Sequence, residues 1–323
     1  MSTTDLPKTI KSLIQPDIHS TKLILTTIPL PTITPGTTEH LIRIQSTSPC
    51  SGELLWAANF STYTTPNKLQ VPCYDLSGTV VLAPPDSPFP VGTEVYTRTS
   101  FMRPGNAREY SVALQEELAR KPKNMSWEEA ACIPLSAFTA WQALFVYGGL
   151  RCLFASDAKE ENGGKTVLVD AASGGVGVMV VQFARAGGVG WVVGICSGRN
   201  RELVGRLGAD EIVDYGEESI EEWGERSGRK VDLVVDMEGG KVVSVKEDPN
   251  AWRPKEGVAD DVEGIFFVME PEGWQLEETA RLIEMGQVRA VVDSVWPLSE
   301  FEKAFAVVEG GHAKGKVVIN VRD

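Results

Sequence analysis

The sequence predicts an α/β protein in which a partly open β-barrel is followed by a doubly wound parallel sheet. Two observations lead to this fold class. Residues 1–124 contain many short apolar runs between turns rich in Pro and Thr, which is typical of a small barrel. From Lys165 onward, apolar runs alternate with helical patterns, which is typical of parallel strands joined by helices. This change in the pattern of apolar residues places the boundary between the two domains near residue 125.

Composition limits the possible partners. The chain has 323 residues and a net charge of -13, which argues against nucleic acid or an anionic membrane surface as a partner. Its five cysteines are odd in number and show no CxxC spacing, so neither a disulfide framework nor a structural zinc site is indicated. No signal peptide and no apolar run of membrane-spanning length is visible. We therefore expect a cytoplasmic protein that acts on a small molecule.

The elements follow from local patterns. In the first domain the expected strands are 12–15, 22–25, 40–44, 78–82 and 93–96. Ser126, with Glu129 three positions later, forms a capping box, so a helix begins at Trp127 and runs to about Phe145 with an interruption near Pro134. Residues 151–164 are expected to form a polar loop. Near the C-terminus we expect helices at 276–285 and 298–308, and strands at 288–295 and 316–319.

The second domain opens on a pattern typical of a dinucleotide site. An apolar run at 167–169 leads into a glycine-rich turn at 172–177, and helical spacing follows. The missing side chains at Gly174 and Gly175 would let the backbone approach a pyrophosphate, Gly177 would let helix and strand pack closely, and the helix N-terminus would offer free N–H groups. The turn residues expected to contact the cofactor are Ser173, Gly174, Gly175 and Val176. Ala172 stands where the first glycine usually lies, and a tight turn without ligand is the alternative interpretation.

Several segments together resemble one family. They are 124–131 (NMSWEEAA), 139–144 (TAWQAL), 172–177 (ASGGVG), 207–211 (LGADE) and 311–318 (GHAKGKVV). As a set they are similar to zinc-independent medium-chain dehydrogenase/reductases of the quinone oxidoreductase or enoyl reductase type. The residues in these segments most resemble those of fungal members. The resemblance implies a GroES-like barrel at 1–124, a Rossmann domain at 125–289 and a return to the barrel at 290–323. It also implies NADPH and the reduction of an activated carbon–carbon double bond in an enone or quinone.

The residues can be compared with the zinc ligands of metal-dependent relatives. Cys50 resembles the first ligand, but Tyr74 stands where a histidine would be, and no ligand is found near Leu135 and Ser136. A lone thiolate cannot form a three-ligand catalytic site, so we expect no zinc. Cys50 remains a candidate site residue, although a small buried apolar role is the favoured interpretation.

Cofactor preference depends on the residues after the strand at 191–195. No acid follows it to bind ribose hydroxyls; instead Ser197, Arg199 and Arg201 offer hydrogen-bond donors suited to a 2′-phosphate. Tyr215 resembles a tyrosine that neighbours this phosphate in the family. The alternative is a solvated helix N-terminus with incidental arginines. We therefore expect NADPH rather than NADH.

Tyr74 is the first candidate for catalysis, because its hydroxyl could hydrogen-bond the substrate carbonyl where a metal would otherwise lie. A core tyrosine is the alternative. Trp56 and Phe60 are expected to wall the substrate pocket, although core packing would explain them equally well. By the resemblance, Thr139 and Phe267 lie near the nicotinamide, and Lys316 reaches the cofactor unless it is a surface lysine. The segment 264–269 resembles the edge strand through which two subunits of a homodimer pair.

One segment departs from the family pattern. Only residues 237–241 separate the apolar run ending at Asp236 from the next run at Val242, so a crossover helix is missing after residue 240. Because parallel neighbours usually need a dozen or more connecting residues, we expect residues 242–245 to form a hairpin, leave the sheet or sit in a distorted register. The departure leaves two alternatives to a reductase. These are a non-redox cyclase or isomerase, and a non-catalytic nucleotide-binding protein on the same scaffold.

Overall fold

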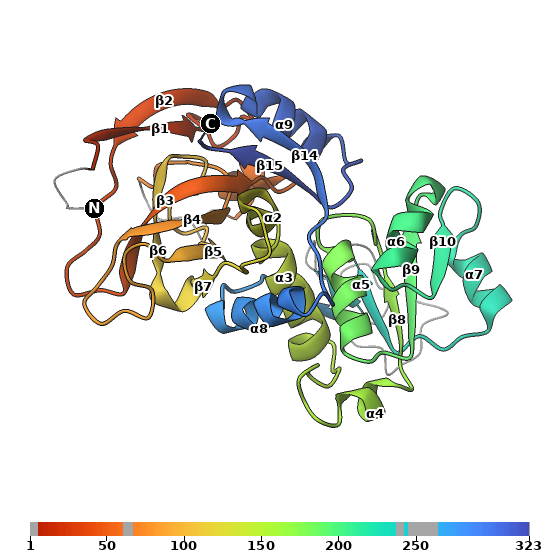
Figure 1. Ribbon diagram of the computed structural model, residues 1–323. Helices are drawn as coiled ribbons and strands as arrows, with labels where there is room; N and C mark the ends of the chain where they lie inside the picture. Colours follow the sequence, from red (N-terminus) through yellow and green to blue (C-terminus); the bar gives the residue numbers. More distant parts are fainter. Residues whose placement is uncertain (1–5, 61–66, 237–241, 245–263, 323) are drawn as a thin grey trace. The chain divides into compact units, whose positions relative to one another are not determined.

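A computed structural model describes residues 6–60, 67–236, 242–244 and 264–322, and it divides the chain into two compact units (Figure 1). Unit 1 comprises Met1–Leu135 and Glu270–Asp323, and unit 2 comprises Ser136–Met269. These boundaries differ from the expected ones because the first helices and α8 (Gly273–Glu284) pack in the first unit. The Tyr96 hydroxyl, for example, donates to the carbonyl oxygen of Leu276 in α8 at 2.6 Å.

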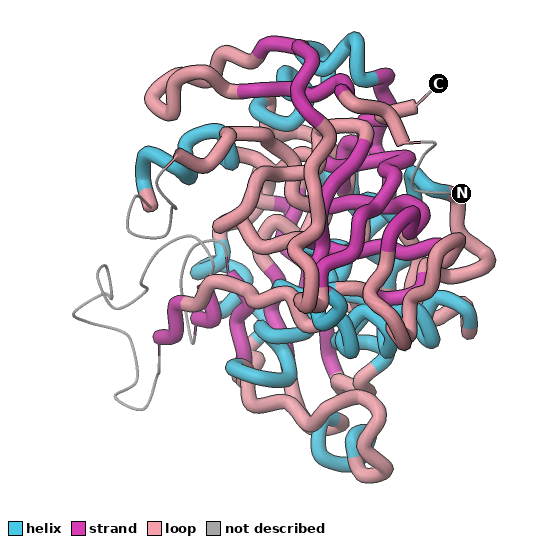
Figure 2. Tube along the Cα trace, turned by 90° about the vertical axis from the view of Figure 1, so that its left-hand side faces the viewer, coloured by secondary structure: helices cyan, strands magenta, loops and turns pink. Residues whose placement is uncertain are grey.

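Unit 1 is built on a strongly twisted seven-stranded sheet, whose strands are magenta in the upper part of Figure 2. The strand order is β14-β15-β3-β4-β5-β7, and β6 also pairs with β3. The bounds are β3 (Glu39–Ser48), β4 (Asp75–Leu82), β5 (Glu94–Arg98), β6 (Tyr110–Leu114), β7 (Ala119–Arg120), β14 (Val292–Pro297) and β15 (Lys316–Asn320). A separate antiparallel ribbon consists of β1 (Thr9–Ile14) and β2 (Ile24–Pro29). The C-terminal segment thus returns to the first unit as β15, which is antiparallel to β3.

The helices of unit 1 are η2 (Glu53–Leu55), α1 (Trp56–Asn59), η4 (Gln115–Glu117), α2 (Trp127–Ala131), α8, η8 (Leu298–Glu300) and α9 (Phe301–Glu309). Helix α2 begins at the expected Trp127 and η8 at the expected residue 298, whereas α8 begins three residues before the expected 276, and η2, α1 and η4 were not expected. The capping box is present: Glu129 N donates to Ser126 Oγ at 3.2 Å, and Ser126 N donates to Glu129 Oε2 at 2.9 Å. A new helix, α3 (Pro134–Trp141), starts at the expected interruption and continues into a π-helical turn, η5 (Gln142–Tyr147).

Unit 2 contains a six-stranded parallel sheet in the order β10-β9-β8-β11-β12-β13, which confirms the doubly wound prediction. The strands are β8 (Thr166–Val169), β9 (Trp191–Cys196), β10 (Glu211–Asp214), β11 (Leu233–Asp236), β12 (Val242–Ser244) and β13 (Gly264–Phe266). Its helices are α4 (Ala158–Asn162), α5 (Gly177–Ala186), η6 (Gly198–Asn200), α6 (Arg201–Leu207) and α7 (Ile220–Ser227). Helices α5 and α6 contact each other, and each contacts β9 (Figure 1).

Strand β12 corrects an expectation. It neither forms a hairpin nor leaves the sheet, but pairs in parallel with β11, with Val242 opposite Val234. A crossover of a dozen residues is usual because the chain must run back along the whole length of the first strand before the second can start. Here β11 and β12 share only three paired positions, so the distance from the end of β11 to the start of β12 is short. That path is about 8 Å, which a few extended residues can cover. The connecting residues 237–241, where the sequence lacks a crossover helix, lie outside the described residues.

Two smaller points complete the comparison with the sequence. The segment 151–164, expected to be a loop, contains the short helix α4, and β6 and β7 were not expected. Strand β13 lies at one edge of the parallel sheet; pairing of two subunits through residues 264–269 stays a prediction. None of the described helices is both long and apolar enough to span a bilayer.

Candidate functional site

The glycine-rich turn of unit 2 has the geometry of a phosphate cradle. Ala171 adopts a positive φ of 42°, and the N–H of Ala172 donates to Ile195 O in the neighbouring strand at 2.9 Å. The residue with the positive φ, Ala171, therefore lies one position before Ala172, which stands where the first glycine of the pattern usually lies. Gly177 starts α5, and a Cβ there would lie 2.7 Å from Ala172 Cα and closer still to Ala171 O. Only glycine permits this approach. The N–H groups of Val178, Met179 and Val180 donate to Gly174 O and Val176 O, so within the described residues a phosphate would meet the N–H groups just before them, up to Gly177.

Asn200 supports this turn and was missed by sequence reasoning. It is buried, and its Nδ2 donates to Ser173 Oγ at 2.9 Å, while its Oδ1 has no hydrogen-bond partner in the described residues. The contact holds the expected cofactor-contacting residue Ser173 from the segment after β9. No local pattern could have joined two residues that lie on different strand–helix turns.

The expected phosphate site after β9 contains the predicted donors and an unpredicted carboxylate. Arg199 is exposed, Arg201 pairs with Glu217 at 3.4 Å, and Tyr215 is 65% exposed. At the end of β10, Asp214 packs directly against Gly198, where a Cβ would lie 3.2 Å from Asp214 Cγ. The sequence correctly shows no acid after β9, but the carboxyl ends of parallel strands meet at one edge and bring Asp214 there.

In unit 1, three strand ends gather the other candidate residues. Ser48 at the end of β3 is paired with Asp75 at the start of β4, and Asp75 is paired with Arg98 at the end of β5. Cys50 and Tyr74 adjoin these paired positions in the chain. Residues from distant parts of the sequence therefore meet at one end of the barrel sheet.

Lys316 lies in this cluster and is buried. Its Nζ donates to Pro49 O at 2.9 Å and lies 3.4 Å from Asp75 Oδ2. The other carboxylate oxygen of Asp75 accepts a hydrogen bond from Leu135 N at 2.7 Å. Burial acts to lower the pKa of Lys316, but Asp75 outweighs it and raises the pKa. The lysine is thus not a surface residue; its expected contact with a cofactor stays a prediction.

Tyr74 is held between an aromatic ring and two cations. Its ring stacks on Trp56 with centroids 5.8 Å apart, and the Arg98 guanidinium lies 5.7 Å from its centroid. Lys68 Nζ donates to the Tyr74 hydroxyl oxygen at 3.1 Å. Burial raises the pKa of Tyr74, so the phenol keeps its proton at neutral pH. Burial, followed by the neighbouring Arg98, lowers the pKa of Lys68 to about 8.

Glu53 is a second residue of this cluster that the sequence analysis missed. Its Oε1 accepts a hydrogen bond from Cys73 N at 2.9 Å, whereas its Oε2 is buried without a partner in the described residues. Burial raises the pKa of Glu53 to about 7. A signal was available, since Glu53 follows Cys50 closely in the chain, but a single glutamate carries no pattern by itself.

This pKa makes the stability of the protein dependent on pH. Between pH 4.5 and about 7 the unfolded chain ionises Glu53 while the folded protein keeps the proton. The free energy of unfolding should therefore fall as pH rises, by on the order of 3 kcal/mol when both states have ionised. Urea unfolding at pH 5 and pH 8 should show a loss in the wild type that is smaller in Glu53→Gln. The exposed Glu225→Gln serves as the control, and an unchanged loss in Glu53→Gln would contradict the assignment.

The remaining predicted residues are spread over both units. In unit 1, Cys50 is a partly exposed free thiol and Phe60, at the end of α1, is 38% exposed. In unit 2, Thr139 is buried on α3, and Phe267 is buried with its ring 4.6 Å from that of Tyr147. Their proposed contacts with substrate or nicotinamide stay predictions.

Comparison with known proteins assigns the family. A family model described as zinc-binding dehydrogenase matches residues 207–319. A protein of Arthroderma benhamiae named "Probable zinc-binding oxidoreductase, mitochondrial" is 44% identical over 336 aligned positions, which cover 99% of both chains. The chain belongs to the zinc-binding dehydrogenase family. The resemblance to this dehydrogenase/reductase family is thereby confirmed, whereas independence of zinc stays a prediction.

Two further proteins are similar over most of the chain. The "Chloroplast envelope quinone oxidoreductase homolog" of Arabidopsis thaliana is 30% identical, covering 90% of this chain and 92% of its own. The solved structure of the quinone oxidoreductase from Coxiella burnetii matches with a TM-score of 0.76 at 24% identity, covering 98% of this chain and all of that one. The latter comparison establishes the fold.

The family's name raises the question of whether these residues fit zinc. In the described residues no three His, Cys, Asp or Glu side chains are arranged to hold a metal ion. Of the three expected ligand positions, only the first holds a usual zinc ligand, Cys50, because Tyr74 stands in the second and Leu135 and Ser136 stand near the third. The donor set therefore does not fit the family's three-ligand catalytic site.

Proposed function

We propose that the chain is an NADPH-dependent oxidoreductase that reduces the activated double bond of a small enone or quinone without zinc. The main support is the environment of Tyr74. Because Lys68 donates to the phenolic oxygen, and no acceptor takes the phenolic proton in the described residues, the O–H is free to donate to a substrate oxygen. The names of the family members, among them quinone oxidoreductases, point to the same reaction class.

The chain's residues have separable tasks in this reaction. NADPH, when bound, supplies a hydride to the carbon β to the carbonyl. The turn from Ser173 to Val176 and the N–H of Gly177, the first residue of α5, would bind its pyrophosphate, and Arg199 would bind the 2′-phosphate. Tyr74 would donate a hydrogen bond to the carbonyl oxygen as that oxygen gains negative charge, and Lys68 would strengthen this bond by polarising the phenol.

Purified protein should oxidise NADPH in the presence of 1-phenyl-2-buten-1-one, with NADH a poorer donor. Tyr74→Phe should lower kcat roughly 100-fold with little change in KM, because the hydrogen bond strengthens as charge develops. Tyr110→Phe, another buried tyrosine of unit 1, should leave turnover unchanged. The loss of NADPH absorbance gives the rate. Full activity in Tyr74→Phe would remove the proposed role of the hydroxyl.

Two observations define the competing outcomes. Asp214 beside Gly198 would repel a 2′-phosphate and could bind ribose hydroxyls, so a preference for NADH in the same assay would assign the site to Asp214.

The short link between β11 and β12 favours the non-redox alternatives, a cyclase or isomerase or a nucleotide-binding protein without catalysis. Calorimetric binding of NADPH without turnover of any enone or quinone would support the second of these. A cytoplasmic location also stays a prediction, since the Arthroderma relative is named mitochondrial.

A further inference from the structure

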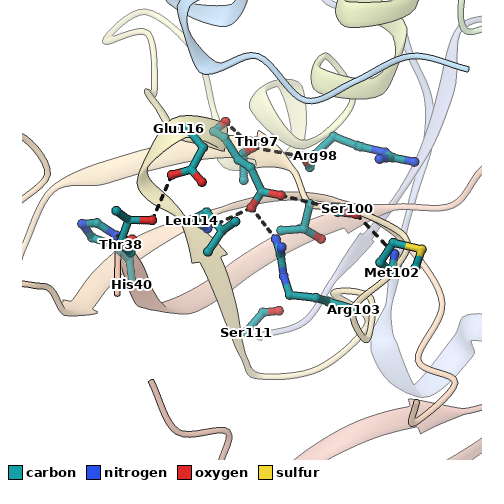
Figure 3. A network of polar contacts seen from close by, with 12 residues as sticks. Thr38, His40, Thr97, Arg98, Ser100, Met102, Arg103, Ser111, Leu114 and Glu116 are labelled. Atoms are coloured by element: carbon teal, nitrogen blue, oxygen red, sulfur yellow. Dashed lines mark hydrogen bonds and ion pairs between the residues drawn. The ribbon is translucent and has the colours of Figure 1, made fainter. Parts of the chain in front are cut away.

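Arg98 is a buried cation that the proposed hydride transfer does not use. It is 3% exposed, and its Nε has no hydrogen-bond partner in the described residues. Two arginines in the described part of the chain are more than nine-tenths buried. Arg108 donates to Ser111 Oγ at 2.8 Å, whereas within the described residues no hydrogen bond or ion pair engages the Arg98 guanidinium. In Figure 3 the Arg98 side chain extends away from Arg103 and Ser100, and no dashed line reaches its guanidinium.

The nearby carboxylates are already engaged elsewhere. Asp75 is ion-paired with Lys316 and accepts the Leu135 N–H. Glu117 is ion-paired with Arg103, and its oxygens also accept from Leu114 N at 2.8 Å and Ser100 N at 3.1 Å. Each of these two carboxylates is thus matched by a cation of its own. Among the residues that the structure describes, no carboxylate contacts the positive charge of Arg98 directly.

The contacts that Arg98 does make place its charge beside the candidate catalytic residue. Its guanidinium lies 5.7 Å from the ring centroid of Tyr74 and 5.8 Å from that of Phe101. Lys68 lies over the same Tyr74 ring at 5.5 Å. Two cations therefore flank one phenol. Cation–π contacts of this kind recover only part of what a buried guanidinium loses on leaving water.

We infer that Arg98 binds a carboxylate carried by the substrate, next to the carbonyl group that Tyr74 would bind. This inference rests on the proposed function and names its substrate class as keto acids with a conjugated double bond. A guanidinium is suited to the task because it presents two parallel donors to a carboxylate. The purely structural alternative is that stacking on Tyr74 and Phe101 is the whole role of Arg98.

The first experiment measures binding alone, so it does not depend on turnover. The probes are 3-benzoylpropionate, a saturated keto acid that cannot be reduced at a double bond, and its uncharged methyl ester. Quenching of tryptophan fluorescence reports binding, since Trp56 stacks on Tyr74. The wild type should bind the acid at least roughly tenfold more tightly than the ester. Arg98→Met should lose this preference, and Arg98→Lys should retain part of it.

Arg108→Gln is the matched control, because it also removes a buried guanidinium from unit 1. It should keep the preference for the acid, and thermal melting should show that both variants remain folded at the assay temperature. Arg98→Lys provides the milder change if Arg98→Met does not fold. Equal affinity of the wild type for acid and ester, or a preference for the acid that survives in Arg98→Met or is undiminished in Arg98→Lys, would overturn the inference.

A second experiment separates this inference from the proposed function. NADPH consumption is followed with 3-benzoylacrylate and with its methyl ester. Preferential reduction of the acid by the wild type, lost in Arg98→Met, supports both proposals. Tight binding of the saturated acid without reduction of either enone would leave the carboxylate site standing and remove the reductase. Equal reduction of acid and ester would support the reductase and overturn the role of Arg98.

Discussion

Replacing Lys316 with methionine is expected to lower the free energy of unfolding by about 3–5 kcal/mol, because it leaves the buried Asp75 carboxylate without its cation. Both side chains are less than a tenth exposed, so water cannot solvate the remaining charge. The double variant Asp75→Asn/Lys316→Met should recover much of the loss, since the amide oxygen can still accept from Leu135 N. Urea unfolding of the single and double variants measures the difference.

A matched control distinguishes the buried pair from an ordinary one. Arg281 and Glu278 form an exposed pair at 3.0 Å on α8, with the arginine 64% exposed. Arg281→Met should cost less than about 1 kcal/mol, because exposed ion pairs contribute little. If Lys316→Met costs no more than Arg281→Met, the buried pair does not carry the stability assigned to it.

Replacing Gly177 with alanine is expected to weaken NADPH binding by roughly 100-fold, an effect of 2.7 kcal/mol or so in binding free energy. The added Cβ would lie 2.7 Å from Ala172 Cα and closer to Ala171 O, and both are backbone atoms that cannot rotate away. The turn must therefore open, which moves the start of α5 away from the phosphate position. Calorimetry with NADPH and a thermal melt of the same sample measure affinity and stability together.

The control for this substitution is a helical glycine in open space. A Cβ at Gly205 in α6 would meet no atom within 4 Å. Gly205→Ala should leave NADPH affinity unchanged and raise stability by up to about 1 kcal/mol, because alanine is the better helix former. Wild-type affinity in Gly177→Ala would show that the turn does not form the proposed cradle.

Local patterns account for most of the fold. The turn at 172–177, the capping box of Ser126 and Glu129 and the break at Pro134 each depend on residues a few positions apart, and all three lie where expected. The expectation for β12 was wrong because a rule for strands of ordinary length was applied to one of three residues. Strand β7 was missed because a strand of two residues has no alternating pattern of its own, whereas β6 was missed although it has five residues, as the expected β5 has.

The sequence by itself determined the fold class, the family and the glycine-rich turn at 172–177, since these reside in periodicity and in runs of adjacent residues. Only the tertiary structure revealed the surroundings of the candidate site. Asp75 with Lys316, Tyr74 with Lys68 and Arg98, and Asp214 with Gly198 are brought together when strand ends align at the edge of a sheet. Burial then decides which charges are matched and which pKa values move, and burial is a property of the assembled sheet rather than of any single segment.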